Sequence, residues 1–136
     1  MQPIRIYTDG ASRGNPGDAA IGVVILEGDT VLAELRECIG TQTNNWAEYE
    51  AVVQALLKAG ELGLVERTIR MHMDSKLVAE QLSGNWKIKE PALKEQHARA
   101  MHIVEDGGFK DVSYTYIPRA QNAHADRLAN EALDSA

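Results

Sequence analysis

The order of strand-like and helix-like periodicity along the chain is the strongest constraint on its fold. Three segments with strand period or buried apolar character come first, at residues 4–9, 20–27 and 30–39. The later segments alternate in type: helix 45–59, strand 68–73, helices 74–82 and 91–105, strand 112–117 and helix 122–133. Short connections predict an antiparallel meander for the first three strands, whereas intervening helices predict parallel pairing with right-handed crossovers for the last two. We therefore expect an α/β fold, a five-stranded mixed sheet of three antiparallel strands followed by two parallel ones, with helices on both faces.

Length and composition predict one globular domain, residues 1–136. Hydrophobic residues make up 44% of the chain and charged residues 25%, and no apolar run approaches the ~20 residues that a membrane span needs. The amino-terminal stretch MQPIRIYTDG has no charged leader followed by an apolar segment, so we expect no signal peptide. Cys38 is the only cysteine, which excludes an internal disulfide and suits a reducing compartment. We expect a monomeric, cytoplasmic protein without a membrane partner.

Four carboxylates occupy positions that local structure alone explains only in part. Asp9 is expected to end the first strand before a Gly-rich loop, GASRGNPG, where Asp-Gly is also a strong turn signal. Glu48 falls on the apolar side of its helix, and a capping box with Asn45 as N-cap is the local alternative. Asp74 follows a strand and could cap the next helix. Asp126 lies in the first turn of the last helix, where the macrodipole favours an acid.

Taken together, the four positions predict a shared site. Asp9 and Asp74 each follow a strand, and open α/β sheets place their sites at the carboxyl ends of strands. Two carboxylates ~4 Å apart repel by about 4 kcal/mol at an effective dielectric near 20, so such a cluster either raises its own pKa values or holds cations. Oxygen ligands without His or Cys select Mg²⁺ or Mn²⁺ over zinc, and paired ions of this kind serve phosphodiester hydrolysis. The net charge of −6 argues against a nucleic-acid binder unless the acids surround such a cation site.

Four motifs carry a resemblance to a known family. They are TDGASRGNPG at residues 8–17, TNNWAEYEAV at 43–52, MDSKLV at 73–78 and PRAQNAHADRLA at 118–129. In this order and spacing they resemble the type 1 ribonuclease H family. The segment SGNWKIKEP, between the short helix and the long one, is too short for the basic helix and loop of many bacterial members. The chain is therefore similar to the short, archaeal-type form of the family.

The resemblance implies a ribonuclease H-like fold and an endonuclease that cuts the RNA strand of RNA–DNA hybrids. It implies two Mg²⁺ ions, with Mn²⁺ as a possible substitute, and products with 5′-phosphate and 3′-hydroxyl ends. The implied catalytic residues and metal ligands are Asp9, Glu48, Asp74 and Asp126. The implied substrate-binding residues are Ser12, Asn15, Thr43, Asn44, Asn45 and Lys76. A solvated lysine is an equal alternative for Lys76, and helix capping is the alternative for Asn44 and Asn45.

The chain departs from the family pattern at one auxiliary position. Many members carry a histidine in a flexible loop before the last aspartate, whereas His124 lies only two residues before Asp126 and already within the predicted helix. Arg119 is a second candidate, because it could supply a positive charge there. Three alternative functions remain open: a nuclease for double-stranded RNA or DNA junctions, a hybrid-binding domain that does not cut, and an actin-like phosphotransferase. The phosphotransferase fold needs two such domains, whereas this chain has room for one. The presence of all four carboxylates argues against a hybrid-binding domain that does not cut.

Overall fold

The computed structural model describes residues 1–136 and has the predicted order of elements. They are β1 Ile4–Gly14, β2 Gly17–Glu27, β3 Thr30–Gln42, α1 Asn44–Glu61, β4 Thr68–Met73, α2 Lys76–Leu82, α3 Pro91–Asp106, β5 Asp111–Tyr116 and α4 Ala123–Asp134, with a 3₁₀ turn at Arg119–Gln121. None of the helices combines the length and the apolar composition that crossing a membrane requires.

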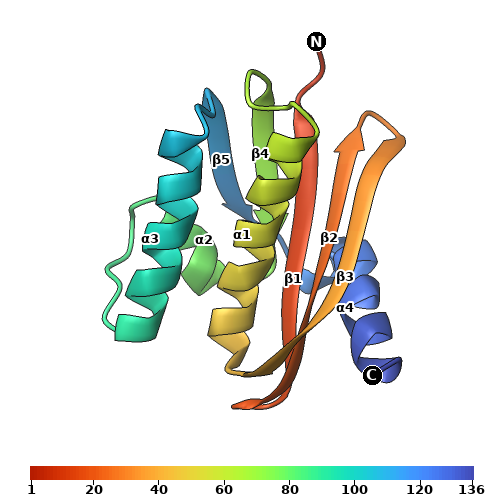
Figure 1. Ribbon diagram of the computed structural model, residues 1–136, viewed down its shortest axis with the longest axis vertical. Coiled ribbons are helices and arrows are strands. Elements are labelled where there is room, and N and C mark those ends of the chain that lie inside the picture. The colour runs from red at the N-terminus through yellow and green to blue at the C-terminus, as the bar shows by residue number, and fades with distance from the viewer.

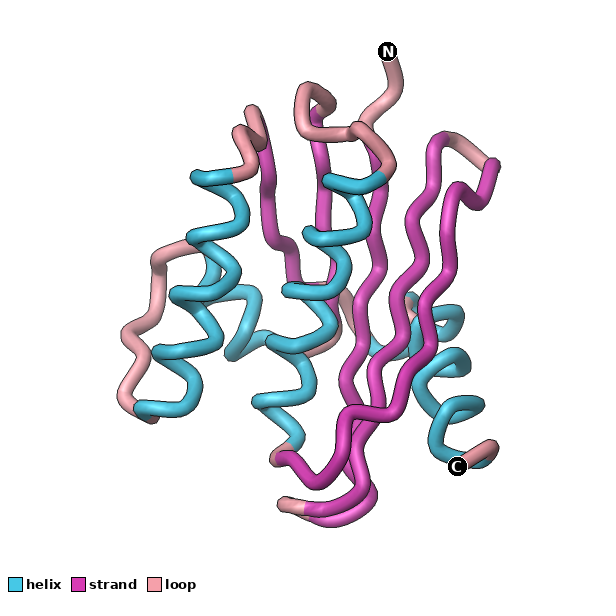
Figure 2. The backbone as a smooth tube through the Cα atoms, in the orientation of Figure 1, coloured by secondary structure: helices cyan, strands magenta, loops and turns pink.

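The five strands form one mixed sheet in the order β3-β2-β1-β4-β5. The strands β1, β2 and β3 are antiparallel neighbours, whereas β4 runs parallel to β1 and β5 runs parallel to β4. Figure 1 and Figure 2 show the hairpins of β1–β3 on one side of the sheet and the two crossover strands on the other. The predicted arrangement of three antiparallel strands followed by two parallel ones is confirmed.

Helices cover both faces of the sheet, as predicted. The long helix α1 packs on β1 and β2 with α3 against it, while α4 packs on β1, β2 and β3 from the other face (Figure 1). The core between α1 and the sheet is buried and mostly aliphatic, with Ile4, Ile6 and Val52 among its members and Tyr49 as its one aromatic residue. Alternation along β1 places Ile4 and Ile6 in this core, so their neighbours in sequence face the α4 side.

The predicted end of the first strand is wrong, because β1 continues past Asp9 to Gly14. The segment expected as a Gly-rich loop is the second half of a long hairpin, in which Gly10 pairs with Ile21 and Gly14 pairs with Gly17. Only Asn15 and Pro16 form the turn. The glycines and the asparagine of this segment suggested a loop. Gly10 instead allows α1 to pack closely on β1, because a Cβ at this position would lie 2.2 Å from the main chain of Ala47 in α1.

Two further expectations about α1 are corrected. The N-cap is Thr43, whose hydroxyl accepts a hydrogen bond from the Trp46 N–H at 3.2 Å, so Asn45 and Glu48 do not form a capping box. Helical period in the sequence predicts a polar stripe of Glu50, Gln54, Lys58 and Glu61, but Glu50 is buried against α3. Its carboxylate accepts hydrogen bonds from Arg99 at 2.6 Å and from Gln96 at 3.1 Å, and these partners lie 46 or more residues away in sequence.

The connection between α2 and α3 is short and has no helix, as expected for the short form. Residues 83–90 are held to α2 by main-chain hydrogen bonds from Asn85 and Trp86 to the Glu80 carbonyl. The Gln81 amide also donates to the Lys87 carbonyl at 3.3 Å. Trp86 is 44% exposed, whereas Ile88 packs against the core.

The close approach of α4 to β2 predicts that Gly22→Ala destabilises the protein. A Cβ on Gly22 would lie 2.0 Å from the Ala125 carbonyl oxygen, and rigid main chain cannot move aside as a side-chain tip would. We expect a loss of about 1–3 kcal/mol in the free energy of unfolding, measured by urea denaturation. Gly60→Ala is the control, because its Cβ would meet only the Phe109 ring at 3.9 Å. A Gly22→Ala protein as stable as the Gly60→Ala protein would contradict this packing.

Candidate active site

The site begins where β1 and β4 separate. Their last paired residues are Thr8 and Met73, after which β1 continues and β4 ends. Asp9 and Asp74 each follow this last pair directly, so the parallel register brings the two residues to the same level of the sheet. The Asp74 carboxylate does not cap α2, because Ser75 does so by accepting a hydrogen bond from the Val78 N–H at 3.3 Å.

Glu48 reaches the same place from α1. Its side chain is 7% exposed, and Oε1 accepts a hydrogen bond from the Gly10 N–H at 2.5 Å. The missing side chain of Gly10 allows the first turns of α1 to approach β1 this closely. A tertiary contact thus explains why an acid lies on the apolar side of an amphipathic helix.

Asp126 reaches the site from the opposite face of the sheet, on α4. Gly22 lets the helix lie against β2, and the Asn122 side chain ties the start of α4 to β1 by donating to the Thr8 carbonyl at 2.9 Å. The Asp126 carboxylate is 29% exposed and lies 3.7 Å from the Arg119 guanidinium. Asn130, one turn further along α4, donates to the same carboxylate oxygen at 3.4 Å.

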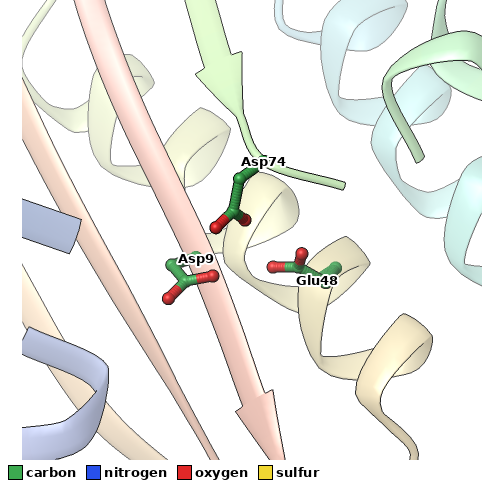
Figure 3. A group of neighbouring side chains, drawn as sticks. All are labelled: Asp9, Glu48 and Asp74. Atoms are coloured by element: carbon green, nitrogen blue, oxygen red, sulfur yellow. The ribbon is translucent and has the colours of Figure 1, made fainter. Parts of the chain in front are cut away.

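Three of the four predicted carboxylates form a tight cluster. Asp9, Glu48 and Asp74 each offer a carboxylate oxygen, and these oxygens lie within 4.8 Å of one another. Figure 3 shows the three side chains coming from β1, α1 and the end of β4 toward one common space. Asp126 lines the same cavity of about 480 Å³ without belonging to the tight cluster. The four chain positions thus meet at one cavity, as the sequence predicts.

The electrostatics of the cluster favour a bound cation. Burial raises the pKa of Asp9, and the nearby charges of Glu48 and Asp74 raise it further. Burial also raises the pKa of Glu48, while the hydrogen bond from Gly10 opposes that rise. Two cationic side chains line the cavity, but Arg119 is 80% exposed, and Arg13 is 50% exposed and paired with Asp134, so the protein itself compensates little of this negative charge. Carboxylate oxygens without a His or Cys ligand suit Mg²⁺ or Mn²⁺, and the residues present therefore fit such ions.

Comparison with known proteins places the chain in a family. A family model described as "Reverse transcriptase-like" matches residues 7–132. Ribonuclease HI of Halobacterium salinarum is 47% identical over 134 residues, which are 98% of this chain and 65% of that protein. Ribonuclease H of Verminephrobacter eiseniae is 30% identical over an alignment of 153 positions, gaps included, which covers 100% of this chain and 94% of that protein. The chain belongs to the ribonuclease H family.

A solved structure agrees with this assignment. The crystal structure of LC11-RNase H1 in complex with an RNA/DNA hybrid superposes with a TM-score of 0.93, at 45% identity, over 97% of both chains. The curated relatives differ in length. The chain spans only 35% of the Bifunctional protein Rv2228c of Mycobacterium tuberculosis, to which it is 47% identical.

The predicted substrate residues of this ribonuclease H domain divide between two neighbouring cavities. Ser12 and Asn44 line the carboxylate cavity, whereas Asn15, Thr43 and Asn45 line a second cavity of about 350 Å³. The cavities adjoin because the Asn15 side chain accepts a hydrogen bond from the Asn44 N–H at 3.1 Å, which joins the tip of the β1–β2 hairpin to the start of α1. Thr43 has a structural role as the N-cap of α1 as well.

Of the three remaining predicted residues, Arg119 lines a cavity, whereas His124 and Lys76 do not. Arg119 lines the carboxylate cavity, as expected for a positive charge beside Asp126. His124 points elsewhere, because its ring contacts Glu34 on β3 and does not line either cavity. Lys76 is the exposed first residue of α2 and also lines neither cavity.

Sequence reasoning missed three residues that hold the site together. Gly10 was interpreted as a loop residue, and Asn122 only as the start of a helix. Asn130 had a detectable signal, since it follows Asp126 by four residues and so lies on the same helix face. The contacts of Gly10 and Asn122 span 38 and 114 residues, and no local pattern reports them.

The raised pKa values predict an unusual pH dependence for the metal-free protein. A carboxyl group whose pKa is higher in the folded state binds more protons there, so its contribution to stability decreases as pH rises. For Asp9, burial and the charges of Glu48 and Asp74 raise the pKa to about 10, so this decrease runs from about pH 4 to about pH 10. We expect Asp9→Asn, which removes one such group, to increase the free energy of unfolding in EDTA at pH 8 and to change it little near pH 4.

Urea denaturation in EDTA at both pH values measures this effect. Glu105→Gln is the control, because it removes an exposed charge that has no hydrogen-bond or ion-pair partner. Loss of stability in Asp9→Asn at pH 8 would contradict the proposed repulsion within the cluster.

Proposed function

We propose that this domain is an endonuclease that hydrolyses the RNA strand of RNA–DNA hybrids with two divalent cations. Mg²⁺ is the proposed ion, with Mn²⁺ as a substitute. The observation that carries the proposal is the cluster of Asp9, Glu48 and Asp74 oxygens within 4.8 Å, in a chain of the ribonuclease H family. The hybrid bound by LC11-RNase H1, a structural neighbour, supports the choice of substrate.

The residues of the chain hold and orient the reactants. Asp9 is central, because its carboxylate has Glu48 and Asp74 as close neighbours and Asp126 in the same cavity. We infer that Asp9 would hold the ions together with Glu48 and Asp74, and that Asp126 would contribute a further ligand. When bound, two such ions lower the pKa of an attacking water and neutralise charge on the phosphate and the departing oxygen. No nucleophilic side chain is needed, and the products would carry 5′-phosphate and 3′-hydroxyl ends.

Selection of RNA requires groups that meet the 2′-hydroxyl, which is both a donor and an acceptor. Asn44 and Ser12 line the carboxylate cavity and offer such groups. The Ser12 hydroxyl donates to the Gln42 carbonyl at 2.8 Å, so its oxygen is fixed in place and can still accept. The second cavity, with Asn15 and Asn45, extends this polar surface away from the carboxylates. We infer that the hybrid lies across both cavities.

Asp74→Asn is expected to keep the fold and abolish Mg²⁺-dependent cleavage. The amide keeps the shape of the side chain but removes the charge that holds a cation, and removing a group that acts with its neighbours commonly reduces kcat by about 10³-fold or more. Cleavage of a labelled hybrid measures the effect, and circular dichroism checks the fold. Asp111→Asn on β5 is the control, since this exposed carboxylate lies on the edge strand outside both cavities. Undiminished cutting by Asp74→Asn would reject its role as a metal ligand.

A substrate panel separates the proposed function from its alternatives. Labelled RNA–DNA hybrid, RNA duplex, DNA duplex and a DNA junction are each incubated with Mg²⁺, Mn²⁺ or EDTA. We expect cleavage of the RNA strand of the hybrid with either ion, and no cleavage in EDTA. Cleavage of the RNA duplex or the junction in preference to the hybrid would contradict the proposed substrate, and binding of the hybrid without cutting would contradict enzymatic activity.

A further inference from the structure

Asn122 is a buried polar residue whose environment a purely structural role does not explain. Its side chain is 1% exposed, and the amide nitrogen donates one hydrogen bond, to the Thr8 carbonyl at 2.9 Å. Its Oδ1 accepts no hydrogen bond within the chain. The desolvation cost of a buried, unpaired amide oxygen is as large as, or larger than, the stability that one hydrogen bond contributes. An apolar side chain would fill this space at lower cost.

The position of Thr8 explains what the hydrogen bond does. Alternate residues of a strand direct their main-chain groups to the same edge, so the Thr8 carbonyl and the Gly10 N–H both lie on the edge that β4 leaves unpaired after Met73. Glu48 accepts from Gly10 and Asn122 donates to Thr8. Two side chains therefore replace the missing strand, and Asp9 lies between their attachment points.

The same residue is connected directly to Asp126. The Asp126 N–H donates to the Asn122 carbonyl at 3.1 Å, which is the first helical hydrogen bond of α4. A short path thus runs from the main chain beside Asp9, through the Asn122 side chain and carbonyl, to the main chain of Asp126. The other end of α4 is held separately, by an ion pair between Arg13 and Asp134 at 2.6 Å.

We propose that Asn122 is a positioning residue that holds Asp126 at the distance from Asp9 that a shared pair of cations requires. This inference rests on the proposed function, because it assigns Asp126 to the metal ligands. Asn122 touches neither cation nor substrate in this role and acts only through Asp126. Residues that orient metal ligands in this way typically affect metal affinity or activity about 10–100-fold when they are changed.

Asn122→Leu tests the proposal, because leucine has the same number of side-chain heavy atoms and the same branching but removes the donor together with the unpaired oxygen. We expect Mn²⁺ affinity, measured by calorimetry without substrate, to fall about tenfold and kcat on the hybrid to fall by at least as much. KM for the hybrid should stay within about twofold of the wild-type value, because the substrate surface is unchanged. Asn122→Ser is a second variant, in case leucine perturbs the fold. Serine is smaller and keeps a hydroxyl donor, so we expect its Mn²⁺ affinity to lie between that of Asn122→Leu and that of the wild-type protein.

Leu133→Ala is the matched control for a general loss of stability in α4. Leu133 is 8% exposed near the far end of the helix, and its truncation leaves the path from Thr8 to Asp126 intact. We expect this variant to unfold at a lower temperature but to bind Mn²⁺ normally below its midpoint. Wild-type Mn²⁺ affinity in Asn122→Leu, or equal losses of affinity in Leu133→Ala, would overturn the positioning role. If the wild-type protein does not cut the hybrid, the proposed function fails, whereas the Mn²⁺ titration still decides the role of Asn122.

Discussion

The early end of β4 is the constraint on which the site depends. After Thr8 and Met73, β1 continues alone on that edge, paired only with β2. The edge is closed by side chains instead of a strand, with Glu48 from one face of the sheet and Asn122 from the other. Both faces therefore contribute a helix to one point of the sheet. This arrangement is how four carboxylates from distant parts of the chain reach a single cavity.

Two glycines make that approach possible, and the carboxylates then make it electrostatically unfavourable. A side chain at Gly10 or at Gly22 would collide with the main chain of α1 or α4. Once the helices are in place, burial and repulsion raise the pKa values of Asp9 and Glu48. A fold that keeps such a cluster sacrifices stability for a local concentration of negative charge, which is what divalent cations bind. The net charge of −6 is therefore compatible with a nucleic-acid substrate when cations mediate the contact.

Much of this fold can be predicted from the sequence, because hydrophobic period reports element type. The strand and helix order was correct, and so was the mixed sheet, since helical connections impose parallel pairing. Asp74 was identifiable because it follows the end of a strand, and Glu48 because it stands on a helix face that should be apolar. Asp9 was identified at a strand end that the structure places five residues later, at Gly14, and Asp126 only because it completed the set. The extension of β1 past Asp9 was missed, because Gly and Asn are typical of turns and the pairing with β2 that overrides this tendency is tertiary. The burial of Glu50 was missed for the same reason, since its partners Gln96 and Arg99 lie on another helix.

The most direct test of the central claim is to locate bound cations in crystals of the wild-type protein soaked in Mn²⁺, using anomalous diffraction. We predict anomalous peaks in contact with the Asp9 carboxylate, one of them also ligated by Glu48 and Asp74 and another by Asp126. Anomalous peaks only at other surfaces, with the Asp9 carboxylate free of metal, would contradict the claim that these four side chains form one cation site.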